Sequence, residues 1–174
     1  MAHKEQADFC ISVKNKYPTL FDSVDVLDVG SLDINGNNRY LFTNYTYTGV
    51  DIGPGKNVDV VSKGHEYKPG KQFDVVISTE AFEHDKFWKQ TIENCVELTK
   101  SGGIFLFTCA SKGRPEHGTS RSLDWASPYS HVQFEDYYMN LNKEDVEPFL
   151  KGFKETYFEY NSKACDLYFY GIKE

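Results

Sequence analysis

The sequence predicts an α/β fold with a mostly parallel sheet that ends in an antiparallel hairpin. Three observations support this prediction: short apolar, β-branched runs recur along the chain, a helical pattern separates two of them, and two aromatic runs close it. Strands of a parallel sheet covered on both faces require such runs, because their side chains do not meet water. Since 174 residues contain no linker or internal repeat, we expect a single domain over residues 1–174.

The first half of the chain contains one expected helix and four expected strands. Phe9, Val13 and Tyr17 are spaced by four and precede Pro18, which predicts an N-terminal helix that ends there. The four strands are expected where β-branched and apolar runs lie between Gly, Asn or Pro residues, at 24–29, 45–50, 58–61 and 73–78.

The second half is expected to contain two helices, a fifth strand and the hairpin. A helical pattern covers 85–100, and Gly102-Gly103 are expected to stop that helix before a strand at 104–109. A short helix is expected around 144–150, followed by hairpin strands at 153–160 and 165–172. The segment 110–142 has no clear period, and a connection of this length predicts a lid or a binding loop.

Composition narrows the class of protein. There are 26 acidic and 19 basic side chains, so the net charge of -7 disfavours broad binding to nucleic acid or to an anionic membrane. The four cysteines have no metal or disulfide spacing, and we expect them to be reduced and buried. The first seven residues are polar and no apolar run is long enough to span a bilayer, so we expect a soluble, cytoplasmic protein.

Candidate ligand-binding residues follow the expected strands. Gly30 ends the first strand and lets the backbone approach a ligand, but Leu32 stands where a dinucleotide-binding loop has its second glycine. Asp51 ends the second strand, where nucleoside-binding α/β proteins place an acid that accepts both ribose hydroxyls. Glu80 and His84 follow the fourth strand at the same edge of the sheet.

Four motifs, in this order, resemble class I S-adenosylmethionine-dependent methyltransferases. They are Val-Leu-Asp-Val-Gly-Ser at 26–31, Tyr-Thr-Gly-Val-Asp at 47–51, Phe-Asp-Val-Val-Ile-Ser-Thr-Glu at 73–80 followed by Glu83-His84, and Thr-Lys-Ser-Gly-Gly-Ile-Phe-Leu-Phe-Thr at 99–108. Gly-Arg-Pro-Glu-His-Gly at 113–118 resembles a motif of small methyltransferase-domain proteins with no assigned substrate. The resemblance implies a Rossmann-like sheet and S-adenosylmethionine as the cofactor.

The resemblance also implies roles for individual residues. Asp28 and Gly30 would hold the methionine part of the cofactor, and Asp51 would bind its ribose. Lys63 stands near the position where the family commonly has an acid for the adenine amino group, and it cannot accept that hydrogen bond. The full set of expected cofactor-binding residues is Asp28, Gly30, Ser31, Leu32, Asp51, Ile52, Ser78, Thr79 and Glu80.

The expected reaction is methylation of an oxygen or nitrogen atom on a small-molecule or sugar-type acceptor. A hydroxyl acceptor would require a base, and the candidates are His117, His84 and Glu80. No metal site is expected, since the acidic segment 33–37 lacks the spacing of a calcium loop. Two alternatives remain open: a non-catalytic module that binds S-adenosylmethionine, and another Rossmann-type nucleotide-dependent enzyme.

Overall fold

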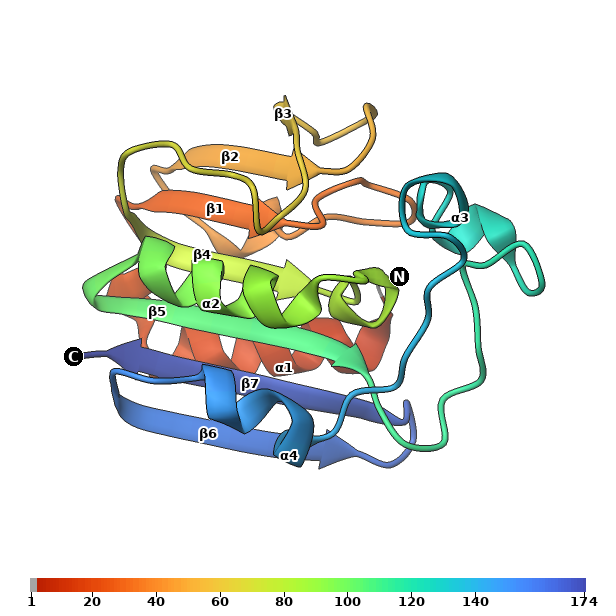
Figure 1. Cartoon of the computed structure of the whole chain (residues 1–174). Coiled ribbons are helices and arrows are strands. Elements are labelled where there is room, and N and C mark those ends of the chain that lie inside the picture. Colours follow the sequence, from red (N-terminus) through yellow and green to blue (C-terminus); the bar gives the residue numbers. More distant parts are fainter. Residues whose placement is uncertain (1–2) are drawn as a thin grey trace.

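A computed structural model describes residues 3–174 and contains one seven-stranded sheet (Figure 1). The strand order across the sheet is β3-β2-β1-β4-β5-β7-β6. The strands are β1 (Asp25–Val29), β2 (Thr46–Asp51), β3 (Val60–Val61), β4 (Phe73–Thr79), β5 (Thr99–Ala110), β6 (Phe153–Asn161) and β7 (Asp166–Lys173).

The register explains why one edge of this sheet can bind a ligand. β1 pairs in parallel with β2 and β4, and β4 pairs in parallel with β5, whereas β7 runs antiparallel to both β5 and β6. The carboxyl ends of β1, β2 and β4 therefore meet at one edge of the sheet. The order of the strands reverses there, because β2 lies on one side of β1 and β4 lies on the other. The predicted sheet, mostly parallel with a terminal hairpin, is confirmed.

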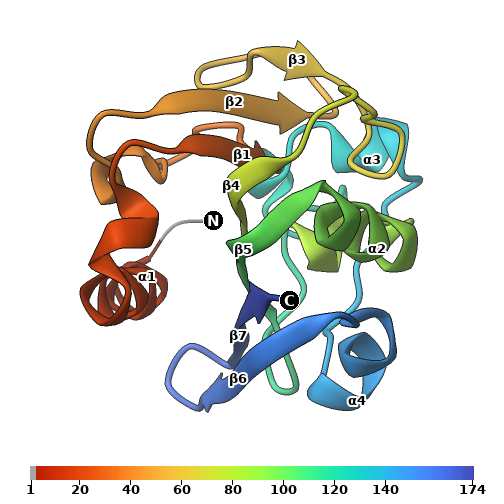
Figure 2. The ribbon, with the colours of Figure 1, turned by 90° about the vertical axis from the view of Figure 1, so that its left-hand side faces the viewer.

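Helices cover both faces of the sheet (Figure 2). α1 (Lys4–Lys16) lies on one face, while α2 (Trp88–Leu98) and α4 (Lys143–Val146) lie on the other. Each side has its own apolar core, one including Phe9 and Val13 of α1 and the other including Ile92 of α2. Strand β1 contributes to both cores because its successive side chains point to opposite faces.

The remaining helical segments are short. The connections from β1 to β2 and from β3 to β4 contain no α-helix, so loops rather than helices make these crossovers. The short segments are η1 (Pro18–Phe21), η2 (Arg39–Leu41), η3 (Phe82–His84), η4 (Asp124–Ala126), α3 (Ser130–Gln133) and η5 (Glu147–Phe149).

The predicted boundary between the helix at 85–100 and the strand after it is wrong. α2 ends at Leu98, and β5 begins at Thr99, so Gly102 and Gly103 lie inside the strand. They occupy a bulge where the pairing of β4 with β5 shifts register. Gly102 has φ +76°, and a Cβ on Gly103 would lie 2.7 Å from the Asp74 carbonyl oxygen. The two glycines therefore serve the strand bulge and do not cap the helix.

Two other features of the second half were predicted with small errors in their bounds. The helix at 144–150 is divided between α4 and η5, and Pro148 lies in η5, where its missing N–H costs no α-helical bond. The hairpin turn is confirmed, with the Asn161 side chain accepting from the Lys163 and Ala164 amides.

All four cysteines are free as expected, although Cys165 is only partly buried. Among residues 3–174, no helix has the length and apolar character that crossing a bilayer requires.

Candidate functional site

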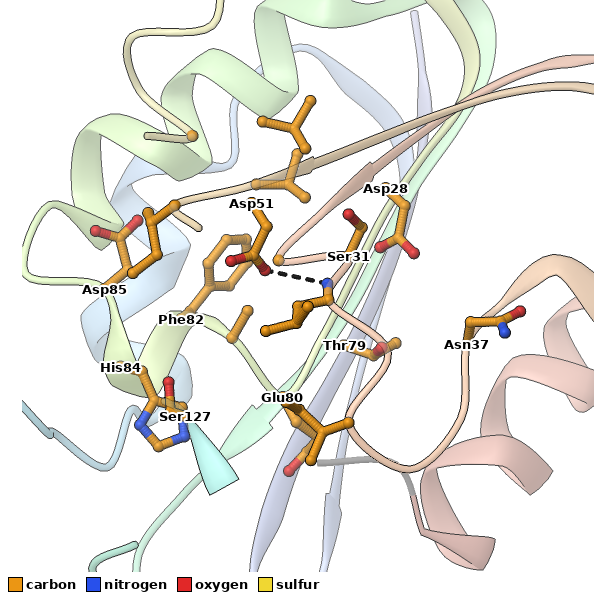
Figure 3. A pocket seen from close by; sticks show the side chains of 18 of the residues that line it. Asp28, Ser31, Asn37, Asp51, Thr79, Glu80, Phe82, His84, Asp85 and Ser127 are labelled. Carbon is orange, nitrogen blue, oxygen red and sulfur yellow. Dashed lines mark hydrogen bonds between the residues drawn. The ribbon is translucent and has the colours of Figure 1, made fainter. Parts of the chain in front are cut away.

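A cavity of about 290 Å³ lies at the carboxyl ends of β1, β2 and β4 (Figure 3). Its walls come from the loops that follow these three strands, from α1, and from the connection between β5 and α4. The volume is close to the lower end of the range for small-molecule sites, about 300–1,000 Å³. This edge is the predicted position of the ligand.

The loop after β1 forms the floor of the cavity. Gly30 has φ +81°, and a Cβ there would lie 2.3 Å from the Cβ of Ala81 in the loop after β4. Only glycine permits both this backbone conformation and this approach of the two loops. The Gly30 and Ser31 amides donate to the Val50 carbonyl of β2, which fixes the start of the loop.

Asp51 is positioned at the end of β2 by backbone amides. One carboxylate oxygen accepts from Leu32 N at 3.1 Å, which Figure 3 marks with a dashed line, and the other accepts from Gly53 N at 3.3 Å. Burial raises the pKa of Asp51, and these amides partly offset the effect because they stabilise the charged form. The side chain is therefore held in one orientation while it lines the cavity.

Asp28 is a buried carboxylate with one oxygen left unpaired. Its Oδ2 accepts from the Tyr47 hydroxyl and from Asn38 Nδ2, whereas its Oδ1 is buried and has no hydrogen-bond partner. Burial raises the pKa of Asp28 to about 6, although the two donors favour its charged form. An unpaired buried carboxylate oxygen at a cavity wall is suited to a ligand that carries a hydrogen-bond donor or a cation.

Glu80 lies at the strained end of β4. It has φ +55°, uncommon for a residue with a side chain, and its amide donates to the Thr108 carbonyl at 2.8 Å. Burial alone would raise the pKa of its carboxyl, but the neighbouring His3, whose Nε2 lies 3.7 Å from Oε2, holds it low. Glu80 is therefore a charged group at the cavity wall.

Glu83, His84 and His117 form a buried group beside the cavity. Glu83 Oε1 lies 3.9 Å from His84 Nε2 and 4.0 Å from His117 Nε2, and the imidazole centroids are 4.9 Å apart. Burial lowers the pKa values of both histidines, so each is a neutral imidazole at pH 7. Burial and the charge of Glu80 raise the pKa of Glu83 to about 8.

The segment between β5 and α4 closes over the cavity as a lid, as predicted. Ala126–Ser130 and Phe134 line the cavity from this side. The Tyr129 ring lies against the backbone of Gly53, where a Cβ would be 2.1 Å from the ring, and its hydroxyl donates to the Pro54 carbonyl at 2.7 Å. The lid therefore contacts the loop that carries Asp51.

The structure brings together most of the residues that the sequence singled out. His84 and eight of the nine expected cofactor-binding residues line the cavity, namely Asp28, Gly30, Ser31, Leu32, Asp51, Ile52, Thr79 and Glu80. Ser78 is the exception: its buried hydroxyl donates to the Val29 carbonyl at 2.7 Å and joins β4 to β1, so its expected position at the cavity is wrong. His117 does not line the cavity either, because its ring packs behind His84 and against Tyr138.

Sequence reasoning missed other residues of the cavity wall. Asp85 was expected only as the start of a helix, but its carboxylate accepts from Phe87 N at 2.7 Å and from the Thr91 hydroxyl, and both Asp85 and Thr91 line the cavity. Lys63 does not line it, although Ser62 and Gly64 do. The acid that ends the strand-to-helix turn was the available signal for Asp85, and the aromatic residues of the expected lid were the signal for Tyr129, which lines the cavity.

Comparison with known families gives a match over most of the chain. The sequence profile described as a methyltransferase domain matches residues 1–141, which extend from α1 through the lid. No curated protein matches the sequence.

Solved structures have the same fold at low sequence identity. Phosphoethanolamine N-methyltransferase 2 of Haemonchus contortus, with phosphomonomethylethanolamine and S-adenosylhomocysteine, has a TM-score of 0.64 and 17% identity over 95% of this chain. This chain covers only 52% of that protein, about half of its length.

Two further structures are covered almost completely. The N-methyltransferase NodS of Bradyrhizobium japonicum, with S-adenosylhomocysteine, has a TM-score of 0.60 and 12% identity, over 94% of this chain and 86% of that one. A methyltransferase of Clostridium acetobutylicum that depends on S-adenosylmethionine has a TM-score of 0.61 and 14% identity, over 100% and 93%. The profile match and the shared fold confirm the resemblance seen in the sequence: this chain belongs to the methyltransferase domain family, in the class I fold of enzymes that use S-adenosylmethionine.

Proposed function

We propose that this chain, acting as one domain over residues 1–174, transfers the methyl group of S-adenosylmethionine to an oxygen or nitrogen atom of a small or sugar-type acceptor. The observation that carries the proposal is a pair of carboxylates, the buried Asp28 and the partly buried Asp51, at the carboxyl ends of adjacent parallel strands in one cavity. A ligand with a cationic amine and a ribose matches this pair, because an amine donates to an unpaired carboxylate oxygen and ribose hydroxyls donate to a second carboxylate.

The residues present fit the cofactor. The unpaired Oδ1 of Asp28 would accept from the amine, the Asp51 carboxylate would accept from ribose hydroxyls, and Asp85 offers a further acceptor at the wall. When bound, S-adenosylmethionine supplies a methyl group that its positively charged sulfur has already activated. The protein must then align the acceptor with that group and, for a hydroxyl, take up a proton.

Small acceptors are favoured by the lid. Residues of 126–134 cover the cavity directly, and no separate acceptor-binding domain exists among residues 3–174. The phosphoethanolamine methyltransferase and NodS, both named as N-methyltransferases, have this fold. His84 and Glu80 are the candidate bases that line the cavity, whereas the third candidate, His117, does not line it.

The test is calorimetric titration with S-adenosylmethionine and with S-adenosylhomocysteine. We expect micromolar binding to the wild type and at least tenfold weaker binding to Asp51→Asn, since charge-assisted hydrogen bonds are worth about 1.5–3 kcal/mol. Asp25→Asn is the matched control, because Asp25 begins the neighbouring strand β1 and pairs with Lys71 outside the cavity. Binding of NADH in place of these ligands, or equal losses in the two variants, would contradict the proposal.

A further inference from the structure

The buried group Glu83, His84 and His117 contains five polar atoms that the protein leaves without hydrogen-bond partners. They are both carboxylate oxygens of Glu83, both ring nitrogens of His84, and Nε2 of His117. The three side chains are at most 6% exposed, so bulk water does not solvate them. Buried polar groups are rarely unpaired, and a cluster of them points to a ligand.

Direct hydrogen bonds do not explain the cluster. The distances of 3.9 and 4.0 Å from Glu83 Oε1 to the two imidazole nitrogens exceed hydrogen-bond length. The other ring nitrogen of His117, Nδ1, lies 3.1 Å from the Pro115 carbonyl oxygen, which can only accept. Nδ1 therefore carries the proton, and the unprotonated Nε2 lies 4.0 Å from Glu83 Oε1 without a hydrogen-bond partner.

The same geometry suits a cation. One carboxylate oxygen and one nitrogen from each imidazole all lie within 4.8 Å of one another. First-row metals bind such ligands at about 2.0–2.2 Å, which separates the ligand atoms by roughly 3.0–3.5 Å. Closing the two measured distances to that range requires movements of about 0.4–1.0 Å, and a pair of ligand atoms at the 4.8 Å limit would have to approach by more than 1 Å. The Pro115 carbonyl orients His117 as an outer hydrogen-bond partner commonly orients a metal-bound histidine.

The surrounding sequence is built around these rings. Gly118 has φ +69°, and a Cβ there would lie 2.6 Å from His84 Cε1, so glycine is needed for the ring to occupy its position. Tyr138 packs against His84 and His117 at centroid distances of 5.4 and 5.1 Å and donates to the Pro115 carbonyl. The segment 113–118 thus holds both imidazoles in place.

We propose that Glu83, His84 and His117 bind a divalent first-row transition metal ion such as Zn²⁺, Fe²⁺ or Mn²⁺. Two imidazoles and one carboxylate are a common ligand set for these ions and leave coordination positions open. His84 lines the cavity, so the ion would lie at the cavity wall. The sequence-based expectation of no metal site is replaced by this proposal.

The place of the ion suggests the class of acceptor. An open position at the cavity wall would take an oxygen donor, such as a hydroxyl or a vicinal diol, and would lower the pKa of that hydroxyl. This role rests on the proposed methyltransferase function, whereas metal binding by itself does not.

The experiment is titration of chelator-treated full-length protein with Co²⁺ alone, followed by visible absorption, and with Zn²⁺ alone in competition. We expect one Co²⁺ to bind per chain and to give the visible absorption bands of a site with few ligands. Co²⁺ should bind at least tenfold more weakly to Glu83→Gln and to His117→Gln. His131→Gln is the matched control, since His131 is an exposed histidine on the lid. It should bind like the wild type.

Two measurements keep the outcome interpretable. X-ray absorption of the Co²⁺-loaded wild type should show imidazole ligands, which does not depend on whether any variant folds. Titration with S-adenosylhomocysteine in the absence of metal reports cofactor binding separately, so failure of the metal site and failure of the proposed function are distinguishable. Wild type that binds no Co²⁺ or Zn²⁺ below about 100 μM, or that binds them without imidazole ligands, overturns the proposal.

Discussion

The Asp28 carboxylate affects both the stability of the fold and the binding of the ligand. Its burial raises its pKa to about 6, and Tyr47 and Asn38 only partly compensate, while Asp51 and Arg39 are the other charged groups that face it. Because its native pKa lies above the unfolded value, the native state binds the extra proton and loses stability as the pH rises through this interval. Asp28 therefore costs stability at neutral pH that its ligand would recover.

We predict opposite effects of Asp28→Asn on these two properties. The amide can still accept from Tyr47 without the charge, so unfolding at pH 7.5 should require on the order of 2 kcal/mol more free energy. Binding of S-adenosylhomocysteine should weaken at least tenfold. In the wild type this binding should also weaken as the pH falls below about 6, where Asp28 becomes protonated, and the variant should lack that dependence. Urea unfolding and calorimetry at pH 5 to 7.5 measure both, and a variant with wild-type affinity would contradict the assignment.

Alanine substitutions at Gly30 and Gly70 separate the cost of backbone strain from the cost of a steric contact. Gly30→Ala adds a Cβ that would meet the Cβ of Ala81 at 2.3 Å in a residue with φ +81°. Gly70→Ala is the control, because Gly70 has φ +72° but no atom within 4 Å of the added Cβ. We predict a loss of about 1 kcal/mol for Gly70→Ala and about 2–4 kcal/mol for Gly30→Ala, measured by urea unfolding. Equal losses would mean that the approach to Ala81 is easily relieved.

The contacts of Tyr129 hold the lid against the loop after β2, and substitutions of this residue test how much they contribute to ligand binding. Tyr129→Ala removes both the ring against Gly53 and the hydrogen bond to the Pro54 carbonyl, whereas Tyr129→Phe removes only the bond. We predict that the alanine variant binds S-adenosylhomocysteine about tenfold more weakly, chiefly through faster dissociation, and that the phenylalanine variant loses less than half of that free energy. Stopped-flow dissociation measures this. Trp125→Ala alters an exposed lid aromatic outside the cavity and should leave dissociation unchanged.

The elements show which parts of the site the sequence could predict. Asp51 and Gly30 were found because an acid or a glycine at the end of an apolar strand is a local pattern, and parallel strands bring their ends together. Tyr129 and Phe134 reach the cavity only through the path of a segment without periodicity. The role of Gly102 depends on a register shift between β4 and β5, which no pattern within one strand encodes.

Contacts between segments far apart in the chain could not be predicted from the sequence either. His117 meets Glu83 only because β5 runs parallel to β4, which brings the segments after the two strands to the same edge of the sheet. The tautomer of His117 depends on a carbonyl two residues away. Ser78 carries the residue type expected for a ligand contact, but alternation along β4 turns it to the Val29 carbonyl. The family was therefore predictable from the order of its motifs, whereas the contacts of single polar side chains required the fold.

At the scale of the whole molecule, an ion-pair network joins distant parts of the chain. His3, before α1, has Nε2 2.8 Å from Asp166 Oδ2 at the start of β7 and 3.7 Å from Glu80 Oε2 after β4. Arg114, at the base of the lid, has Nη1 3.2 Å from Asp166 Oδ1. Burial alone would lower the pKa of His3, but Asp166 and Glu80 raise it to about 9. Glu5, 3.4 Å from its Nδ1, is the other charged group beside it.

This network makes the stability of the chain depend on pH in a defined direction. Because the native pKa of His3 lies above its ordinary value of 6.5, its contribution is fully present below pH 6.5 and is lost as the pH rises through about 9. Since solvent screens the charge of the partly exposed His3, we expect a contribution of about 1–2 kcal/mol. Wild type should exceed His3→Gln by this amount in urea unfolding at pH 6 and by almost nothing at pH 9.5. His131→Gln, which removes an exposed histidine, should match the wild type at both values. A difference between wild type and His3→Gln that is the same at pH 6 and pH 9.5 would show that His3 stabilises the fold by packing and not by its charge.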